Sequence, residues 1–384
     1  MWHDFLMRLT KWYLRRKMYW RQPLALAWLE PENIKRVLLI SATGLGDTLF
    51  STPALRALKE RFPSWSLEVL GHRQYGALLA HNPHVQQLWV YPGRGWRLFS
   101  LGRQLRQRGY DLVIILHGND PEATLLAYWT GSPFIIGSAY SPLAFAYSGR
   151  VKAGDPGEHA IERRLNYVRL LGADTQDKKM DLFLPPEEVA RAEAILAQHF
   201  GAPPPLLVAL HPTGSDPYKW WPHESFVALG NFLHETYGAA LLIISGSQDR
   251  QAAQDLAGRL SGPTLVTGGS HALLTVAALL RQCRLLVAND SGPLHLALAL
   301  RVPSIALIGA DDPRRIGPYA VPWGTNLHKR EQVCDRDPCL TRECPDNKCL
   351  QAIGVGEVTD LIKTWWEPRF LPREEGFMGG GPGN

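Results

Sequence analysis

A short segment in the last third of this sequence combines glycine with side chains that could hold a phosphate group: Asp290, Ser291, Gly292, Pro293 and His295. It follows the apolar run 285–288 and precedes the apolar segment 294–300, an order that predicts a turn between a buried strand and a helix. We expect Asp290 or Ser291 to cap this helix. Free N–H groups and the positive end of the helix dipole at such a turn favour anions. The segment therefore predicts an anion site with His295 beside the ligand. The alternative is an ordinary capped helix that binds no ligand.

A second turn of the same kind places a carboxylate at a helix start. Gly44, Gly46 and Asp47 follow the predicted strand 36–40, and a helical pattern runs on to Arg61. The two glycines allow a tight turn and close approach of the backbone to a ligand. Both the third glycine of a dinucleotide-binding fingerprint and the Gly-Lys-Ser/Thr of a P-loop are missing. A carboxylate at a helix start is stabilised as the anion, so Asp47 fits a general base and equally fits a capping residue.

A third turn lies between the other two in the sequence. The predicted strand 206–210 leads into a turn formed by Thr213, Gly214 and Ser215, and Lys219 follows it. A lysine at this place is a point charge suited to a phosphate. The alternative is a surface lysine beside core tryptophans.

The elements that position these turns alternate between strand and helix patterns, which predicts parallel α/β sheets. A chain of 384 residues, 45% hydrophobic and 20% charged, is long enough for two soluble domains. In parallel sheets the carboxyl ends of the strands share one edge, where ligands bind. We expect the following parts: a basic amphipathic helix at 1–29, a Rossmann-like domain at 34–185, a linker helix at 187–200, a second Rossmann-like domain at 203–353, a helix at 355–370 that packs back across the hinge, and a disordered tail at 373–384. Predicted strands are 36–40, 66–70, 87–91, 111–116, 134–136, 206–210, 240–244, 264–267, 284–288 and 304–308.

Taken together, the three turns resemble the motifs of glycosyltransferase family 9, the lipopolysaccharide heptosyltransferases. The matching segments are Gly44-x-Gly46-Asp47, His211-Pro-Thr-Gly-Ser215 with Lys219, and Asp290-Ser-Gly-Pro-x-His295, in that order. The resemblance covers about residues 35–365. It implies a GT-B fold, in which two Rossmann-like domains face each other across a cleft. It also implies inverting, metal-independent transfer, usually of a heptose from ADP-heptose onto the inner core of lipopolysaccharide.

The resemblance further implies a role for each site residue. Asp47 matches the base that deprotonates the acceptor hydroxyl, and Lys219 matches the lysine that offsets charge on the departing diphosphate. Inverting displacement needs such groups on opposite sides of the reacting carbon. Where relatives hold the donor ribose with a glutamate, this chain has Gln248 or Asp249. The remaining substrate-binding residues implied are Gly44, Gly46, Thr213, Gly214, Ser215, Asp290, Ser291, Gly292, Pro293 and His295.

Two other functions stay open at this stage. The first is transfer of another nucleotide-activated sugar onto a lipid-linked or core saccharide. The second is a catalytically inactive Rossmann-type binding protein at a membrane surface, against which the presence of both Asp47 and Lys219 argues. Without a nucleic-acid motif accompanying its charge, the chain is not expected to bind RNA or DNA.

Positive charge is concentrated at the N-terminus. Residues 1–29 carry a net charge of +5, equal to that of the whole chain, so the remainder is neutral. Aromatic and aliphatic residues there recur at helical spacing among arginines and lysines, a pattern typical of helices that lie in the membrane interface. The alternative is a helix docked on the protein's own body. A cleavage signature and an apolar run of about 20 residues are both missing, so we expect a cytoplasmic protein, peripheral on the inner face of the inner membrane.

A ladder of cysteines follows the second domain's strands: Cys334, Cys339, Cys344 and Cys349. Structural zinc sites usually use cysteine pairs two to four residues apart within two separate knuckles, unlike this even spacing. A structural metal, two disulfides and packed thiols remain as alternatives, of which a cytoplasmic location disfavours disulfides. The transfer reaction itself is expected to require no cofactor.

Overall fold

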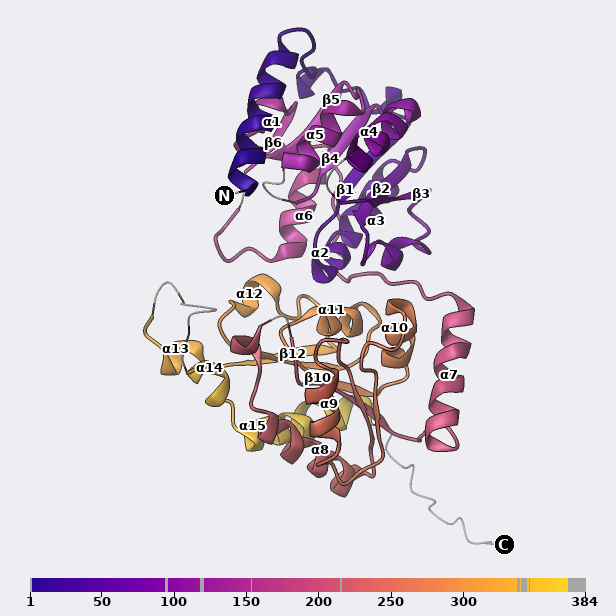
Figure 1. Cartoon of the computed structure of the whole chain (residues 1–384), viewed down its shortest axis with the longest axis vertical. Helices are drawn as coiled ribbons and strands as arrows, with labels where there is room; N and C mark the ends of the chain where they lie inside the picture. The colour runs from indigo at the N-terminus through magenta and orange to yellow at the C-terminus, as the bar shows by residue number, and fades with distance from the viewer. Residues whose placement is uncertain are drawn as a thin grey trace, which may run out of the picture.

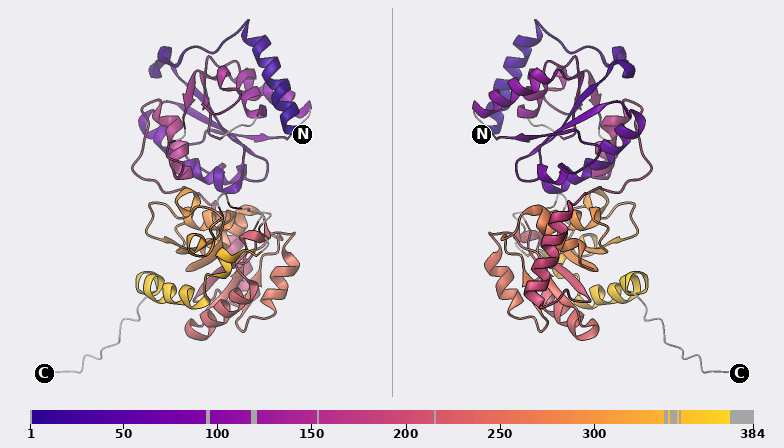
Figure 2. Two further views of the ribbon diagram at one scale, coloured as in Figure 1. Left: turned by 90° about the vertical axis from the view of Figure 1, so that its left-hand side faces the viewer. Right: turned by 90° about the vertical axis from the view of Figure 1, so that its right-hand side faces the viewer.

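The computed structural model describes residues 2–93, 96–117, 121–152, 154–214, 216–336, 339, 344 and 346–371. It contains two six-stranded sheets, each in its own domain, and the domains lie one above the other (Figures 1 and 2). Ser215 and the predicted tail at 373–384 lie outside the described residues.

The first sheet has the order β3-β2-β1-β4-β5-β6, and its paired strands are parallel. Alternate residues of β1 (Arg36–Ser41) belong to different apolar clusters, with Val37 and Leu39 on one face and Leu38 and Ile40 on the other. A strand buried on both faces requires helices on both sides, as in doubly wound folds. Its other strands are β2 (Ser66–His72), β3 (Gln87–Tyr91), β4 (Leu112–Ile115), β5 (Phe134–Ser138) and β6 (Gly149–Val151).

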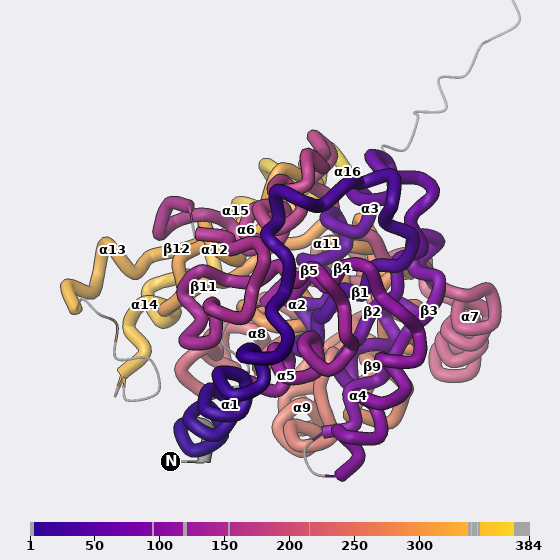
Figure 3. The backbone as a smooth tube through the Cα atoms, turned by 90° about the horizontal axis from the view of Figure 1, so that it is seen from above, coloured from indigo at the N-terminus to yellow at the C-terminus, as the bar shows by residue number. Residues whose placement is uncertain are grey.

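Helices cover this sheet in two layers. One layer consists of α2 (Leu45–Phe50), α3 (Thr52–Arg61) and α6 (Ala160–Arg169). The other consists of α1 (Trp2–Met18), α4 (Trp96–Arg108) and α5 (Pro121–Trp129), with α1 and α4 both packed on α5 (Figure 3).

The helix α1 ends at Met18, so the predicted helix through residue 29 is too long. Pro23, which removes a backbone donor and disfavours helix before it, lies in the extended segment that follows, and only a single 3₁₀ turn forms at Leu26–Trp28. Leu14 and Thr10 of α1 are buried against the domain, which agrees with the docked alternative. Phe5, Leu9 and Trp12, spaced to share one face of the helix, remain exposed.

The second sheet has the order β12-β11-β10-β7-β8-β9, again with parallel pairs. Its strands are β7 (Leu207–His211), β8 (Ala240–Ile243), β9 (Thr264–Val266), β10 (Leu285–Asn289), β11 (Ser304–Ile308) and β12 (Gly324–His328). Its helices are α8 (His223–Tyr237), α9 (Arg250–Ala257), α10 (Leu273–Arg281), α11 (Gly292–Ala299), α12 (Pro313–Ile316), α13 (Arg330–Val333) and α14 (Lys348–Gln351).

The helix that links the two domains and the C-terminal helix both pack on the second domain. The helix α7 (Pro186–Phe200) packs on α10, and Thr275 Oγ1 donates to Glu188 Oε2 at 2.6 Å. The helix α7 is terminated after Phe200 by Gly201, whose φ of +80° is a conformation that glycine adopts readily. The C-terminal helix, α15 (Val355–Leu361) with its continuation to Phe370, buries Trp366 against the second domain's core beside α8. The expectation that this helix packs across the hinge is wrong, because its apolar face packs against α8 of the second domain instead.

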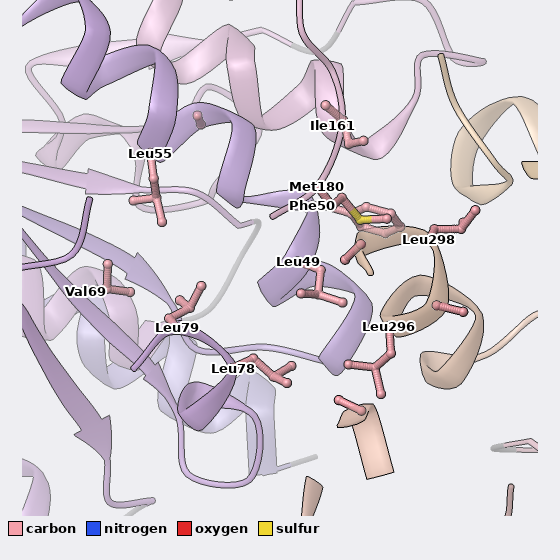
Figure 4. Close-up of a cluster of buried hydrophobic side chains, with 14 of the residues drawn as sticks. Leu49, Phe50, Leu55, Val69, Leu78, Leu79, Ile161, Met180, Leu296 and Leu298 are labelled. Carbon is pink, nitrogen blue, oxygen red and sulfur yellow. The ribbon is translucent and has the colours of Figure 1, made fainter. Parts of the chain in front are cut away.

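The two domains share one apolar cluster. Leu49 and Phe50 on α2 face Leu296 and Leu298 on α11 (Figure 4), and these four side chains are nearly fully buried. Burial on this scale fixes α2 and α11 against each other. Among the described residues, none of the helices combines the length and apolar character that crossing a membrane requires.

Candidate active site

Asp47 lies in the first turn of α2, at the carboxyl end of β1. The Gly44 carbonyl accepts from Thr48 N at 3.0 Å, which closes the turn, and the Asp47 side chain is 41% exposed. Arg164 on α6, itself nearly buried, donates from a terminal guanidinium nitrogen to Asp47 Oδ1 at 2.6 Å. The arginine therefore holds one carboxylate oxygen and leaves the other available. Sequence reasoning missed Arg164, because nothing local relates it to a residue 117 positions earlier.

Gly46 lies where α2 of the first domain packs on α11 of the second. A Cβ atom at this position would lie 2.7 Å from Cδ2 of His295, so only glycine fits. His295 lies on the first turn of α11, as expected, and its ring packs 4.6 Å from that of Phe50. Burial lowers the pKa of His295 to about 3, assisted by the neighbouring His159 and Lys219. The imidazole is therefore neutral at physiological pH and contacts both domains.

Lys219 lies between two carboxyl groups. It ends a 3₁₀ turn (Pro217–Lys219), and its Nζ donates to Asp290 Oδ2 at 3.0 Å and lies 2.6 Å from Asp311 Oδ2. Burial alone would lower the pKa of Lys219, but the two carboxylates outweigh it and raise the pKa, so the ammonium stays charged. Sequence reasoning missed Asp311, although its place three residues after the end of the strand 304–308 was a signal.

Asp290 is almost fully buried at the end of β10. Burial raises the pKa of Asp290 to about 6, with a further increase from Asp311, while Lys219 opposes the shift. Ser291 occupies the N-cap position of α11 as expected, but the capping hydrogen bond from a side chain does not form. Asp290 accepts from Lys219 instead, and Ser291 Oγ donates to the Asn289 carbonyl at 3.2 Å. Pro293 has no N–H and Leu294 N donates to the Ser291 carbonyl at 3.2 Å, so among the described residues the Gly292 N–H at the start of α11 is left for another acceptor.

The turn after β7 lies beside β10. Asn289 Nδ2 donates to the Thr213 carbonyl at 3.3 Å, and Trp220 Nε1 donates to the Gly214 carbonyl at 3.3 Å. Within the described part of the chain, Thr213 Oγ1 is among the buried polar atoms without a hydrogen-bond partner. Leaving a buried hydroxyl unpaired costs free energy. Gln248 is exposed in the turn after β8.

The packing of α2 on α11 brings two of the predicted turns together. Besides the Gly46–His295 approach, a Cβ atom on Gly292 would lie 3.1 Å from Leu45. The turn bearing Asp47 and the turn bearing Asp290 therefore meet at the domain interface, and Lys219 is tied to Asp290. The arrangement offers a carboxylate from one domain and a cation with the Gly292 N–H from the other.

Comparison with known proteins identifies the family. The family model described as glycosyltransferase family 9 (heptosyltransferase) matches residues 98–349. The chain belongs to glycosyltransferase family 9. Lipopolysaccharide heptosyltransferase 1 of Pseudomonas aeruginosa is 30% identical over 328 residues, covering 80% of this chain and 87% of the relative.

Solved structures agree with the GT-B fold of this glycosyltransferase. A glycosyltransferase family 9 protein from Veillonella parvula matches with a TM-score of 0.75 at 23% identity, over 87% of this chain and 97% of that one. An Escherichia coli heptosyltransferase solved with ADP matches with a TM-score of 0.66 at 20% identity, over 85% and 99% of the two chains.

The four-cysteine ladder of the glycosyltransferase lines a pocket that also includes Tyr218 and Ala310, the neighbours of Lys219 and Asp311 in the sequence. Cys334, Cys339, Cys344 and Cys349 all line one pocket of about 70 Å³, and all four are free thiols. Burial raises the pKa of the Cys349 thiol. In the described ranges, no group of three or more His, Cys, Asp or Glu side chains is arranged to hold a metal ion.

Proposed function

We propose that this glycosyltransferase moves a heptose from ADP-heptose onto the inner core of lipopolysaccharide, by inverting, metal-independent displacement. The Pseudomonas aeruginosa relative is a lipopolysaccharide heptosyltransferase, and one structural neighbour was solved with ADP. The observation that carries the proposal is the meeting of the Asp47 and Asp290 turns at one interface.

On the acceptor side, the free Asp47 oxygen takes the proton of the attacking hydroxyl. The hydroxyl oxygen bonds to the anomeric carbon as the bond from that carbon to the diphosphate breaks. Because attack comes from the face opposite the leaving group, the configuration inverts. A positioned base of this kind contributes about 10²–10⁴-fold to the rate.

On the donor side, the Lys219 ammonium and the Gly292 N–H at the start of α11 stabilise the negative charge that develops on the diphosphate. The Asp290 carboxylate keeps the Lys219 ammonium in place by accepting from its Nζ. Thr213 Oγ1 is a further donor for a phosphate oxygen. Gln248, in the turn after β8, would contact the ribose.

The test is a transfer assay with purified enzyme, ADP-heptose and a lipid-linked core acceptor, with a chelator present; mass spectrometry detects the product and NMR gives its anomeric configuration. Product with inverted configuration supports the proposal. Thermal shifts with nucleotide diphosphates test the donor separately, since a ligand at about 100 times its Kd stabilises the fold by about 2.7 kcal/mol. Preference for UDP or GDP over ADP would replace heptose by another sugar, and donor binding without turnover would favour the inactive binding protein.

We place this reaction at the inner face of the inner membrane, where a cytoplasmic nucleotide sugar meets a membrane-anchored acceptor. The support is the cationic N-terminal arm together with the exposed aromatic residues of α1. Fractionation of cells that express the full chain tests this location, and recovery in the supernatant at low salt would contradict it.

A further inference from the structure

An apolar groove lies outside the active site, between α1, α4 and α5. Its volume is about 430 Å³, within the range of ligand-binding sites, and its walls include Leu6, Leu9, Trp12, Leu98, Phe99 and Leu125. These side chains come from three helices, α1, α4 and α5, whose backbones Figure 3 shows on one side of the first domain.

Specific contacts between α1, α4 and α5 hold the groove in shape. Trp129 Nε1 on α5 donates to Tyr13 Oη on α1 at 3.1 Å, which fixes the two helices. The ring of Phe99 stacks on Trp129 with centroids 5.0 Å apart. A Cβ atom on Gly102 would lie 2.7 Å from Trp129, so α4 approaches α5 closely. The three helices therefore form the walls of the groove and are fixed against one another.

The rim of the groove stays apolar where it meets solvent. Trp12 is 60% exposed, Phe99 is 65% exposed, and Trp96 and Phe5 are exposed nearby in the sequence. A soluble surface rarely keeps so many large aromatic side chains together, and such a patch marks an interaction site. Tryptophan at the edge of an apolar surface is typical of proteins that sit at the membrane–water interface.

Basic side chains flank this rim. Arg8, Lys11 and Arg15 recur at three- and four-residue spacing, so they form a stripe beside the one that contains Leu9 and Trp12. Arg97 on α4 is exposed as well. Cations next to an apolar groove complement a lipid with an anionic headgroup and an apolar chain.

We propose that this groove takes an acyl chain of an anionic lipid bilayer and thereby fixes the orientation of the first domain on the membrane. The groove includes Glu122 at the start of α5, which follows β4, the neighbour of β1. It therefore begins at the same edge of the sheet as Asp47. The inference deepens the proposed function, because a lipid-anchored acceptor would then approach Asp47 from the bilayer side.

The test uses the full chain with phosphatidylcholine vesicles, with and without phosphatidylglycerol. A phospholipid with a photoreactive acyl chain should cross-link to α1, α4 and α5. Leu9→Asp puts a charge at the groove and should weaken vesicle binding about tenfold or more. Its control is Val90→Asp, which changes a similarly exposed side chain on β3 and should bind as the unaltered chain does.

A second pair of variants separates charge from chain insertion. Arg8→Glu/Arg15→Glu should weaken binding to phosphatidylglycerol vesicles about tenfold or more, whereas Arg281→Glu/Arg369→Glu, with the same charge change on the second domain, should not. Cross-links outside the three helices, or full binding by Leu9→Asp, would overturn the proposal. Self-association in lipid-free solution that Leu9→Asp abolishes, with vesicle binding intact, would instead assign the groove to a second copy.

Activity keeps this proposal distinct from the proposed function. Leu9→Asp should transfer sugar normally to a water-soluble acceptor without acyl chains and lose activity on the same saccharide anchored in vesicles. Equal turnover by Leu9→Asp on both acceptors would overturn the groove's role in presenting the acceptor. Absence of any heptose transfer by the unaltered chain, with cross-links at the groove, would refute the proposed function and leave lipid binding standing.

Discussion

Arg164 holds Asp47 by one carboxylate oxygen, at 2.6 Å, from a helix that begins more than 110 residues further along the chain. The arginine side chain is nearly buried, whereas the aspartate is partly open to solvent. A buried cation that donates a hydrogen bond to one carboxylate oxygen fixes the direction in which the other oxygen points. The pair therefore prepares Asp47 to receive a proton from one side.

The first prediction concerns Asp47 itself. Asp47→Asn keeps the shape of the side chain and removes its basicity, so the transfer rate should fall by about 10²–10⁴-fold. Binding of ADP, measured by calorimetry, should stay the same. Asp255→Asn, an exposed change on α9, is the control, and near-normal turnover by Asp47→Asn would exclude this residue as the base.

The second prediction concerns the positioning role of Arg164. Arg164→Gln frees the Asp47 carboxylate, so kcat should fall and the pH profile of kcat should shift, while the KM for the donor changes little. Arg164→Lys should restore part of kcat, since it returns a cation without the fork geometry. A loss of thermal stability with unchanged kcat would show a structural role only.

The third prediction uses the Lys219–Asp290–Asp311 group. Lys219→Met leaves the buried Asp290 without its cation, and breaking such a pair costs about 3–5 kcal/mol of unfolding free energy. Adding Asp290→Asn removes the unpaired buried charge. The double variant Lys219→Met/Asp290→Asn should therefore be more stable than Lys219→Met alone. Urea unfolding measures both. Donor affinity should fall in each variant, and retained affinity would mean that Lys219 does not contact the diphosphate.

The fourth prediction tests the close approach at Gly46. Gly46→Ala would push into the His295 ring, and overpacking of this kind costs about 1–3 kcal/mol. Gly46→Ala/His295→Ala should recover stability, because the smaller side chain makes room. Gly356→Ala is the control, since a Cβ atom there meets open space. Equal melting temperatures for Gly46→Ala and the unaltered chain would show that the domains separate without cost.

The fifth prediction is a pH dependence of stability. His159 donates from Nε2 to the Gly317 carbonyl and accepts from Ile161 N, and burial lowers its pKa to about 4. Between an unfolded pKa of about 6.5 and this value, the unfolded chain binds a proton that the folded chain does not. Stability should therefore fall as pH falls through this window, by about 2 kcal/mol from this group at a pH of about 5.

Urea midpoints at about pH 7.5 and pH 5 measure this effect. His159→Gln should reduce the difference between the two midpoints, and His81→Gln, an exposed histidine on a loop, should not. The opposite sign, with the unaltered chain more stable at the lower pH, would contradict a neutral buried His159.

Much of the architecture was predictable because it is local. Runs such as Val37–Ile40 and Leu285–Ala288 are uniformly apolar, as strands buried on both faces must be, and the structure has a strand at each. The edge strands β6 and β12 were missed. Gly149–Val151 is too short to carry a pattern, and Gly324–His328 is only half-buried, so its pairing with β11 rather than its composition makes it a strand.

The sequence by itself determined which turns carry glycine, carboxylate and ammonium groups, and that these turns follow strands. Tertiary structure alone decided that Arg164 pairs with Asp47, that Asp311 joins Asp290 at Lys219, and that His295 packs under Gly46. It also decided that α1 docks through Leu14 while Trp12 faces solvent. The physical reason is that strand and helix patterns depend on neighbours along the chain. Contacts between residues 70 to 250 positions apart depend instead on how two sheets and their helices pack.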